Sequence, residues 1–168
     1  RHLAGLYGSD ADAAEVAALL HDAAKQKPLE EMQALAGRSF TDLPAPIFNI
    51  GSLLHGYAAV TLAREQYGID DPDILSAIAH HTTGAETMGK LEKIIFMADY
   101  IEVNRDFDGV EALRQAAERD LDEAVLLGYD STIRHLLDQK KPIFIGTVVN
   151  RNAHISAMMK AAARKAGR

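Results

Sequence analysis

Residues 93–101 read KIIFMADYI, an apolar run that carries one carboxylate, Asp99, near its end. Its apolar residues recur at the three- and four-residue spacing of a helix face, so we predict a helix over about residues 90–102. A carboxylate in the middle of an apolar helix needs a compensating cation or several hydrogen bonds. Asp99 therefore indicates a buried helix with a functional carboxylate.

Helix signals are also frequent in the rest of the chain, whereas strand signals are scarce. Ser9 or Asp10 can cap a helix from about residue 11, and Asp71 followed by Pro72 can open another. The predicted helices cover about residues 11–24, 28–35, 52–67, 72–81, 90–102, from 109 onward, 121–139 and 146–166. We therefore predict an all-α fold, a bundle of roughly eight helices in one domain over residues 1–168, ending in a basic helical tail at 157–168.

Composition narrows the class of protein. The chain has 168 residues, of which 48% are hydrophobic, as expected for one compact domain. Its formal net charge of -6 argues against broad nucleic-acid binding, which needs clustered Lys and Arg. No apolar run approaches the roughly 20 residues that span a bilayer. We expect a cytoplasmic protein that binds a small molecule, without nucleic-acid or membrane partners.

Histidines and carboxylates are the candidate metal ligands, because the chain has no Cys. His21 and Asp22 follow an apolar stretch at residues 17–20 that we expect to be buried, and a carboxylate in such a place needs a partner or a metal. Such a dipeptide is weak evidence alone, and a His bonded to a backbone carbonyl is the simpler interpretation. His55 and His81, each at the end of an apolar helix, are likewise more often core residues than ligands when taken singly.

Three residues near these candidates could bind a phosphate. Lys25 lies one helical turn beyond His21, where it is equally well explained as a solvated cation at a helix end. Thr82 and Thr83 follow His81 directly and precede Gly84, so hydroxyls and a turn adjoin the candidate ligand. The sequence contains no P-loop, dinucleotide fingerprint, serine nucleophile elbow or His-Glu-x-x-His motif, which removes those chemistries.

The order His-Asp, His, His, Asp resembles that of the HD-domain superfamily of metal-dependent phosphohydrolases. Longer stretches are similar to the YqeK family of symmetrical bis(5′-nucleosyl)-tetraphosphatases. These stretches are LLHDAAK (19–25), HTTG (81–84), LEKII (91–95), ADYIE (98–102) and RDF (105–107). Several motifs in the same order are far more specific than one His-Asp pair.

The resemblance implies a helical HD domain with two metal ions, divalent or mixed-valence, iron being the expected metal. The implied ligands are His21, Asp22, His55, His81 and Asp99. Asp22 would bridge the ions, His21 and Asp99 would hold one, and His55 and His81 the other, with Asp22 and Asp99 as the catalytic carboxylates. His80 is not expected to be a ligand, because the family's metal His directly precedes Thr-Thr-Gly.

The implied reaction is hydrolysis of diadenosine tetraphosphate to two ADP by a hydroxide that both metals activate. Lys25, Arg105 and Thr82 or Thr83 would hold the phosphates. Arg105 is equally well explained as a structural ion-pair partner of a neighbouring aspartate. The alternatives are an HD nucleotidase or phosphodiesterase acting on another nucleotide, and a non-catalytic HD module that senses nucleotides or binds a partner. A homodimer is left open.

Two departures from the family pattern affect these expectations. The family has a further His ligand upstream of the stretch that matches residues 3–8, and His2 is too close to that stretch to be this ligand. We therefore expect that the N-terminal helix is truncated in this chain. In addition, Val103, Asn104 and Asp108 replace the Pro and Gly residues that often flank Arg-Asp-Phe in relatives.

Overall fold

The computed structural model describes residues 1–167, which form ten helices and no strand. The helices are α1 (His2–Tyr7), α2 (Ala11–Leu20), α3 (Leu29–Ser39), α4 (Ala45–Phe48), α5 (Gly51–Tyr67), α6 (Pro72–His80), α7 (Lys90–Tyr100), α8 (Val110–Arg119), α9 (Leu121–Asp138) and α10 (Ile145–Ala166). The all-α prediction is confirmed. The two helices beyond the expected eight are the shortest, α1 with 6 residues and α4 with 4.

Some predicted boundaries were wrong. Helix α2 ends at Leu20 instead of about residue 24, and successive turns follow it, so His21 lies at the helix end. Helix α3 continues to Ser39 instead of ending at about residue 35. Helix α5 begins at Gly51, and no side chain caps its first turn.

Aspartate caps begin three of the helices. Asp10, Asp71 and Asp120 each accept hydrogen bonds from the backbone N–H groups two and three residues further on. These bonds satisfy donors that the first helical turn leaves without a partner. The predicted start at Asp71-Pro72 is thereby confirmed, since Pro72 is the first residue of α6.

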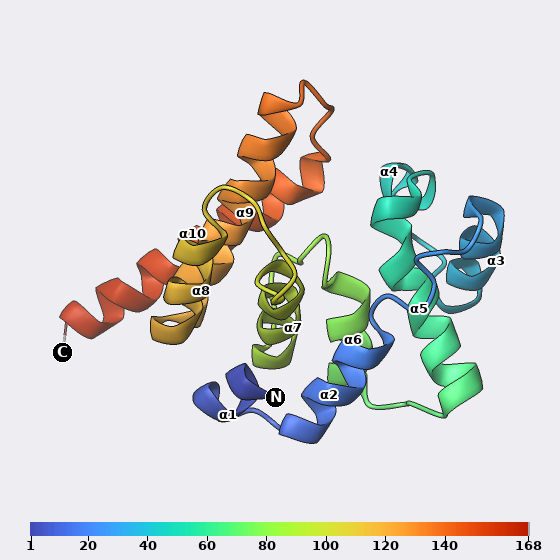
Figure 1. Cartoon of the computed structure of the whole chain (residues 1–168), viewed down its shortest axis with the longest axis horizontal. Coiled ribbons are helices and arrows are strands. Elements are labelled where there is room, and N and C mark those ends of the chain that lie inside the picture. Colours follow the sequence, from blue (N-terminus) through green and yellow to red (C-terminus); the bar gives the residue numbers. More distant parts are fainter. Residues whose placement is uncertain (168) are drawn as a thin grey trace.

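The helices are arranged as two lateral groups with a central one (Figure 1). Helices α2, α6 and α7 pack together in the centre. On one side α5 packs against α6 and carries α3 and α4, and on the other side α9 packs against α7 and carries α8 and α10. The ends of α2, α5, α6 and α7 are therefore brought close to one another.

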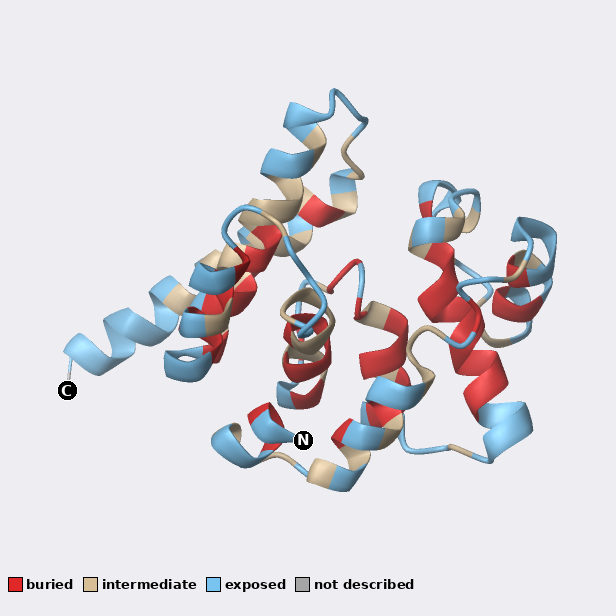
Figure 2. Cartoon of the chain, viewed as in Figure 1, coloured by how far each residue is buried: buried red, intermediate tan, exposed pale blue. Residues whose placement is uncertain are grey.

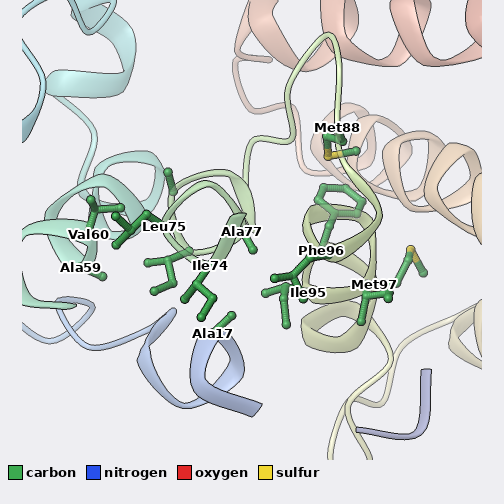
Figure 3. Close-up of a cluster of buried hydrophobic side chains, with 14 of the residues drawn as sticks. Ala17, Ala59, Val60, Ile74, Leu75, Ala77, Met88, Ile95, Phe96 and Met97 are labelled. Carbon is green, nitrogen blue, oxygen red and sulfur yellow. The ribbon is translucent and has the colours of Figure 1, made fainter. Parts of the chain in front are cut away.

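Small side chains allow the central helices to approach closely. Ala17 of α2 and Ala77 of α6 have no exposed surface, and Figure 3 shows them with Ile74 and Ile95 between α2, α6 and α7. In α5 every residue from Leu54 to Ala63 is buried, as the continuous red segment in Figure 2 shows. Close packing of this type restricts how far any side chain at the helix ends can move.

The expectation that residues 17–20 are all buried was wrong. Ala17 is buried, but Leu19 is 76% exposed. Because a helix of 3.6 residues per turn places neighbouring residues on different faces, an apolar run can be buried on one face only.

The last helix, α10, extends beyond the body of the molecule (Figure 1). The predicted basic tail at 157–168 is helical as far as Ala166 and mostly exposed, and Arg168 lies outside the described residues. Within residues 1–167, no helix combines the length and the apolar character needed to cross a membrane.

Gly56 couples the packing of α5 and α6 to the position of His81. A Cβ atom at residue 56 would lie 2.8 Å from the Ile78 carbonyl oxygen and 3.1 Å from Cε1 of His81. The first contact is with backbone, which cannot rotate away. Any side chain at this position must therefore separate α6 from α5.

We expect Gly56→Ala to lower the free energy of unfolding by about 1–3 kcal/mol, as overpacking of a tight core does. Gly37→Ala is the matched control, because a Cβ there meets nothing within 4 Å and Ala favours the helix. Urea unfolding followed by circular dichroism measures both. A Gly56→Ala protein as stable as the parent would contradict the close approach of α5 and α6.

Candidate metal centre

Four helix ends contribute to one cluster of His and Asp side chains. His21 and Asp22 directly follow α2, His55 lies in the first turns of α5, His81 directly follows α6, and Asp99 lies in the last turn of α7. Ligand atoms of these residues lie within 4.8 Å of one another in two groups. The groups are His21, His81 and Asp99, and Asp22, His55 and His81. The structure thus brings together all five residues that the sequence suggested as ligands.

Each imidazole of the cluster is oriented by a backbone carbonyl one turn earlier. The Nδ1 atoms of His21, His55 and His81 lie 2.7, 3.3 and 2.8 Å from the carbonyl oxygens of Ala18, Gly51 and Ile78. A carbonyl oxygen can only accept, so the proton of each neutral ring resides on Nδ1. Each Nε2 atom is then a lone-pair acceptor that faces the cluster.

The Nε2 atoms of His55 and His81 face each other and one carboxylate oxygen of Asp22, and no proton lies between them. His55 Nε2 and His81 Nε2 are 2.9 Å apart. They lie 3.2 and 3.5 Å from the same oxygen of Asp22, Oδ1. That oxygen is buried and, among residues 1–167, has no hydrogen-bond donor. Converging acceptors with no donor are what a cation would compensate.

The other Asp22 oxygen faces the second half of the cluster. Oδ2 lies 3.5 Å from His21 Nε2 and accepts a 2.7 Å hydrogen bond from Lys25. His21 Nε2 in turn lies 3.8 Å from Oδ1 of Asp99. The two oxygens of one carboxylate therefore face different histidines, an arrangement that suits a bridging ligand.

Two cations balance the two carboxylates. Lys25 pairs with Asp22, and Arg105 donates to both the side chain and the backbone carbonyl of Asp99, at 2.7 and 3.1 Å. Burial raises the pKa of Asp99, but His21 and Arg105 outweigh it and hold that pKa well below its usual value. Burial likewise raises the pKa of Asp22, but His81, Lys25 and His21 keep it well below its usual value. Both carboxylates are thus ionised near neutral pH.

The surroundings shift the pKa values of His21 and His55 in opposite directions. Burial lowers the pKa of His21, but the carboxylate of Asp99, the Ala18 carbonyl and the charge of Asp22 outweigh it and raise that pKa. Burial, followed by the nearby charge of His81, lowers the pKa of His55. His55 is therefore neutral near pH 7 and its Nε2 is available as a ligand.

These residues fit a metal ion. Three imidazoles and two carboxylates, with no thiolate, form a donor set suited to iron, manganese, cobalt or zinc. The backbone hydrogen bonds at Nδ1 are the outer-shell support that metal-binding histidines ordinarily have. The His/Asp groups of this chain can thus hold a divalent metal.

The predicted phosphate-binding residues do not all reach the cluster. Thr82 is exposed and its hydroxyl lies 3.5 Å from Nε2 of His55. Thr83 is buried and its hydroxyl donates to the Gly84 carbonyl, so it faces the interior. His80 lies outside the cluster, because its Nδ1 is 2.7 Å from a Glu92 carboxylate oxygen.

Sequence reasoning missed residues of α9 that lie beside the cluster. Thr132, Arg134 and His135 line a groove of about 690 Å³ that also includes Asp99 and Arg105. Thr132 and His135 are one turn apart and share a face of α9, but nothing in the local sequence indicates that this face meets α7. Only the packing of α9 on α7 reveals it.

The sequence of this chain is similar to those of known proteins. Residues 1–104 match the model of the HD domain family. The chain is 43% identical over 150 residues to the symmetrical bis(5'-nucleosyl)-tetraphosphatase of Halalkalibacterium halodurans, covering 89% of this chain and 80% of that protein. It is 39% identical to the protein of the same name from Bacillus subtilis, covering 92% and 82%.

A solved structure agrees with the fold as well. The crystal structure of a predicted HD superfamily hydrolase involved in NAD metabolism, from Clostridium acetobutylicum, superimposes with a TM-score of 0.87 at 42% identity. The match covers 93% of this chain and 82% of that one.

Adjacent histidines provide a test of the cluster. We expect His81→Ala to lose most of its bound metal, because His81 belongs to both ligand groups. His80→Ala should retain the metal, since it removes only the contact with Glu92. Elemental analysis after reconstitution with ferrous iron measures both. Full metal content in His81→Ala, or equal loss in both variants, would contradict the assignment.

Proposed function

Because this chain belongs to the HD domain family, and within it to the symmetrical bis(5'-nucleosyl)-tetraphosphatases, we propose that it hydrolyses diadenosine tetraphosphate to two ADP. The chain is a hydrolase by this relationship, since curated relatives at 34–43% identity over most of its length bear that name. Symmetrical cleavage adds water across the central P–O–P linkage, so that each half retains two phosphates.

One observation carries the proposal: three ligand atoms from three different helix ends converge with no proton donor among them. Nε2 of His55 and Nε2 of His81 are 2.9 Å apart, and both face the buried oxygen of Asp22 that lacks a donor. A purely structural His cluster would place a proton donor between such acceptors. The arrangement supports a bound cation in this position.

The proposed cofactor is a pair of metal ions, with iron as the expected metal. His21 and Asp99 would hold one ion, His55 and His81 the other, and Asp22 would bridge them. The separate orientations of the two Asp22 oxygens support the bridging role. His81 also lies close enough to His21 and Asp99 to belong to either half of the cluster.

The basic residues beside the cluster are proposed to hold the phosphates. Lys25 and Arg105 already lie at the cluster, on Asp22 and Asp99, and their side chains are roughly half exposed, at 45% and 43%. A polyphosphate anchored there would therefore meet both without a large movement of the backbone. Thr82 is exposed beside His55 and can donate its hydroxyl proton, whereas the buried Thr83 is better placed to brace the loop.

The chemistry divides between the cofactor and the protein. Divalent ions, when bound, supply Lewis acidity and a water whose pKa falls toward neutrality. The protein contributes ligands held in fixed orientation, two ionised carboxylates, and cations for the negative charge that grows on the phosphate oxygens. Arg105 suits this last role because its planar guanidinium can donate to a phosphate from two nitrogens.

We expect the iron-loaded protein to convert diadenosine tetraphosphate to ADP as the sole nucleotide product, measured by ion-exchange chromatography. Removal of the metal with a chelator should abolish the reaction, and ferrous iron should restore it. AMP together with ATP would indicate asymmetrical cleavage. A metal-loaded protein that leaves this substrate intact but hydrolyses another nucleotide in a substrate panel would favour a different HD hydrolase activity.

Asp99→Ala should reduce kcat for diadenosine tetraphosphate more than about 100-fold, because loss of an outer-shell partner alone already costs about 10–100-fold at metal sites. Asp70→Ala is the matched control, an exposed carboxylate in the loop before α6. Circular dichroism should show the same helical content in both. Parent-like turnover by Asp99→Ala would refute the assigned role.

A further inference from the structure

Helix α10 contacts the loop that begins at the candidate ligand His81 and runs to Gly84. The side-chain amide of Asn150 donates a 3.0 Å hydrogen bond to the backbone carbonyl of Thr83. The two residues are 67 positions apart in the chain, and Asn150 lies outside residues 1–104, the segment that matches the HD domain family. A residue beyond that segment therefore holds a loop of the metal cluster.

Helix α10 is fixed on α9 in the turns that present Asn150. Arg151 forms a 2.8 Å ion pair with Asp130 of α9, and the two side chains are only 28% and 25% exposed. His154, one turn beyond Asn150, is buried, and its Nε2 donates to the backbone carbonyl of Asp122 at 2.8 Å. The amide of Asn150 thus comes from a helix that is held in place on both sides of it.

Helix α9 confines the same loop. Gly84 is buried and has a φ of 61°, in the left-handed region that favours glycine. A Cβ atom at residue 84 would overlap the hydroxyl of Tyr129, which is itself a buried residue. The hydroxyl of the buried Thr83 donates to the Gly84 carbonyl and is used within the loop. The backbone that follows Thr82 is therefore restricted by both α9 and α10.

Thr82 is an exposed residue between confined neighbours. His81, before it, is buried in the metal cluster, and the carbonyl of Thr83, after it, is held by Asn150. The hydroxyl of Thr82 lies 3.5 Å from Nε2 of His55, so it is directed toward the cluster. If the bond from Asn150 were lost, the peptide after Thr83 could turn, and the direction of the Thr82 hydroxyl would no longer be fixed.

We propose that Asn150 is a positioning residue, which holds the Thr83 carbonyl so that the Thr82 hydroxyl stays directed at a phosphate on the metal cluster. This inference rests on the proposed function for the role of Thr82 as a donor to phosphate. It goes further by giving α10 a part in the site, although none of the five candidate ligands belongs to α10. A hydroxyl that is already oriented loses less freedom on binding than one on a mobile loop.

A double-mutant cycle on phosphate binding tests whether Asn150 acts through Thr82. The iron-loaded protein, freed of excess metal, is titrated calorimetrically with inorganic phosphate. Thr82→Ala should weaken binding about 10- to 150-fold, the range that a hydrogen bond to a charged group contributes. Asn150→Ala should weaken it at least fivefold. The double variant should bind within twofold of Thr82→Ala, because a hydroxyl that is absent cannot be misdirected.

Three controls separate positioning from support of the fold. Asn150→Leu has a similar shape but no donor, so it should lose as much affinity as Asn150→Ala. Asn49→Ala removes the same kind of bond, from a side-chain amide to the Ala45 carbonyl of α4, and should keep the parent's affinity. Elemental analysis and circular dichroism should show the parent's metal content and helical content in every variant, since each keeps all five ligands.

Steady-state kinetics with diadenosine tetraphosphate separates the role of Asn150 from the proposed function. The value of kcat/KM should fall at least fivefold in Asn150→Ala, with no further loss when the change is added to Thr82→Ala. If phosphate binding shows this coupling but the parent does not hydrolyse the dinucleotide, the role of Asn150 stands and the proposed function fails. If the parent hydrolyses it but the two losses multiply, the function stands and the role of Asn150 fails.

Further results overturn the role of Asn150. One is parent-like phosphate binding by Asn150→Ala or Asn150→Leu, which would mean that the hydrogen bond does not matter. Another is loss of metal or of helical content in Asn150→Ala, which would make the residue a general support of the fold. Absence of phosphate binding by the metal-loaded parent overturns it too.

Discussion

Convergence of proton-free acceptors at one point is the constraint on which the rest of the structure depends. Three imidazole nitrogens and two carboxylates come from the ends of α2, α5, α6 and α7, and each ring is fixed by a carbonyl of its own helix. Acceptors that face each other repel unless a cation lies among them. The helices must therefore be packed tightly enough to keep the ligands together whether or not the cation is bound, and that packing supplies the order that metal binding needs.

Small residues in the centre of the molecule meet this requirement. Gly56 lets the backbone of α5 approach the Ile78 carbonyl and the His81 ring, and Ala17 and Ala77 allow α2 to lie against α6. These small residues thus set the distance between the helix ends that carry the ligands. Lys25 and Arg105 complete the electrostatics, because each pairs with one carboxylate while nearly half of its side chain stays exposed.

The sequence by itself determined the helical class and the cap at Asp71, narrowed the first cap to Ser9 or Asp10, and predicted that Asp99 needs a compensating partner, because periodicity and capping act over a few residues of one segment. It also suggested the five ligands, through a resemblance in their order. It did not determine that Leu19 is exposed, that Arg105 pairs with Asp99, or that Thr83 faces the interior, while Thr82 faces the cluster. Those outcomes, and the meeting of α9 with the loop after α7, depend on which helix faces pack together. That choice is made by contacts between residues far apart in the chain, which no local pattern encodes.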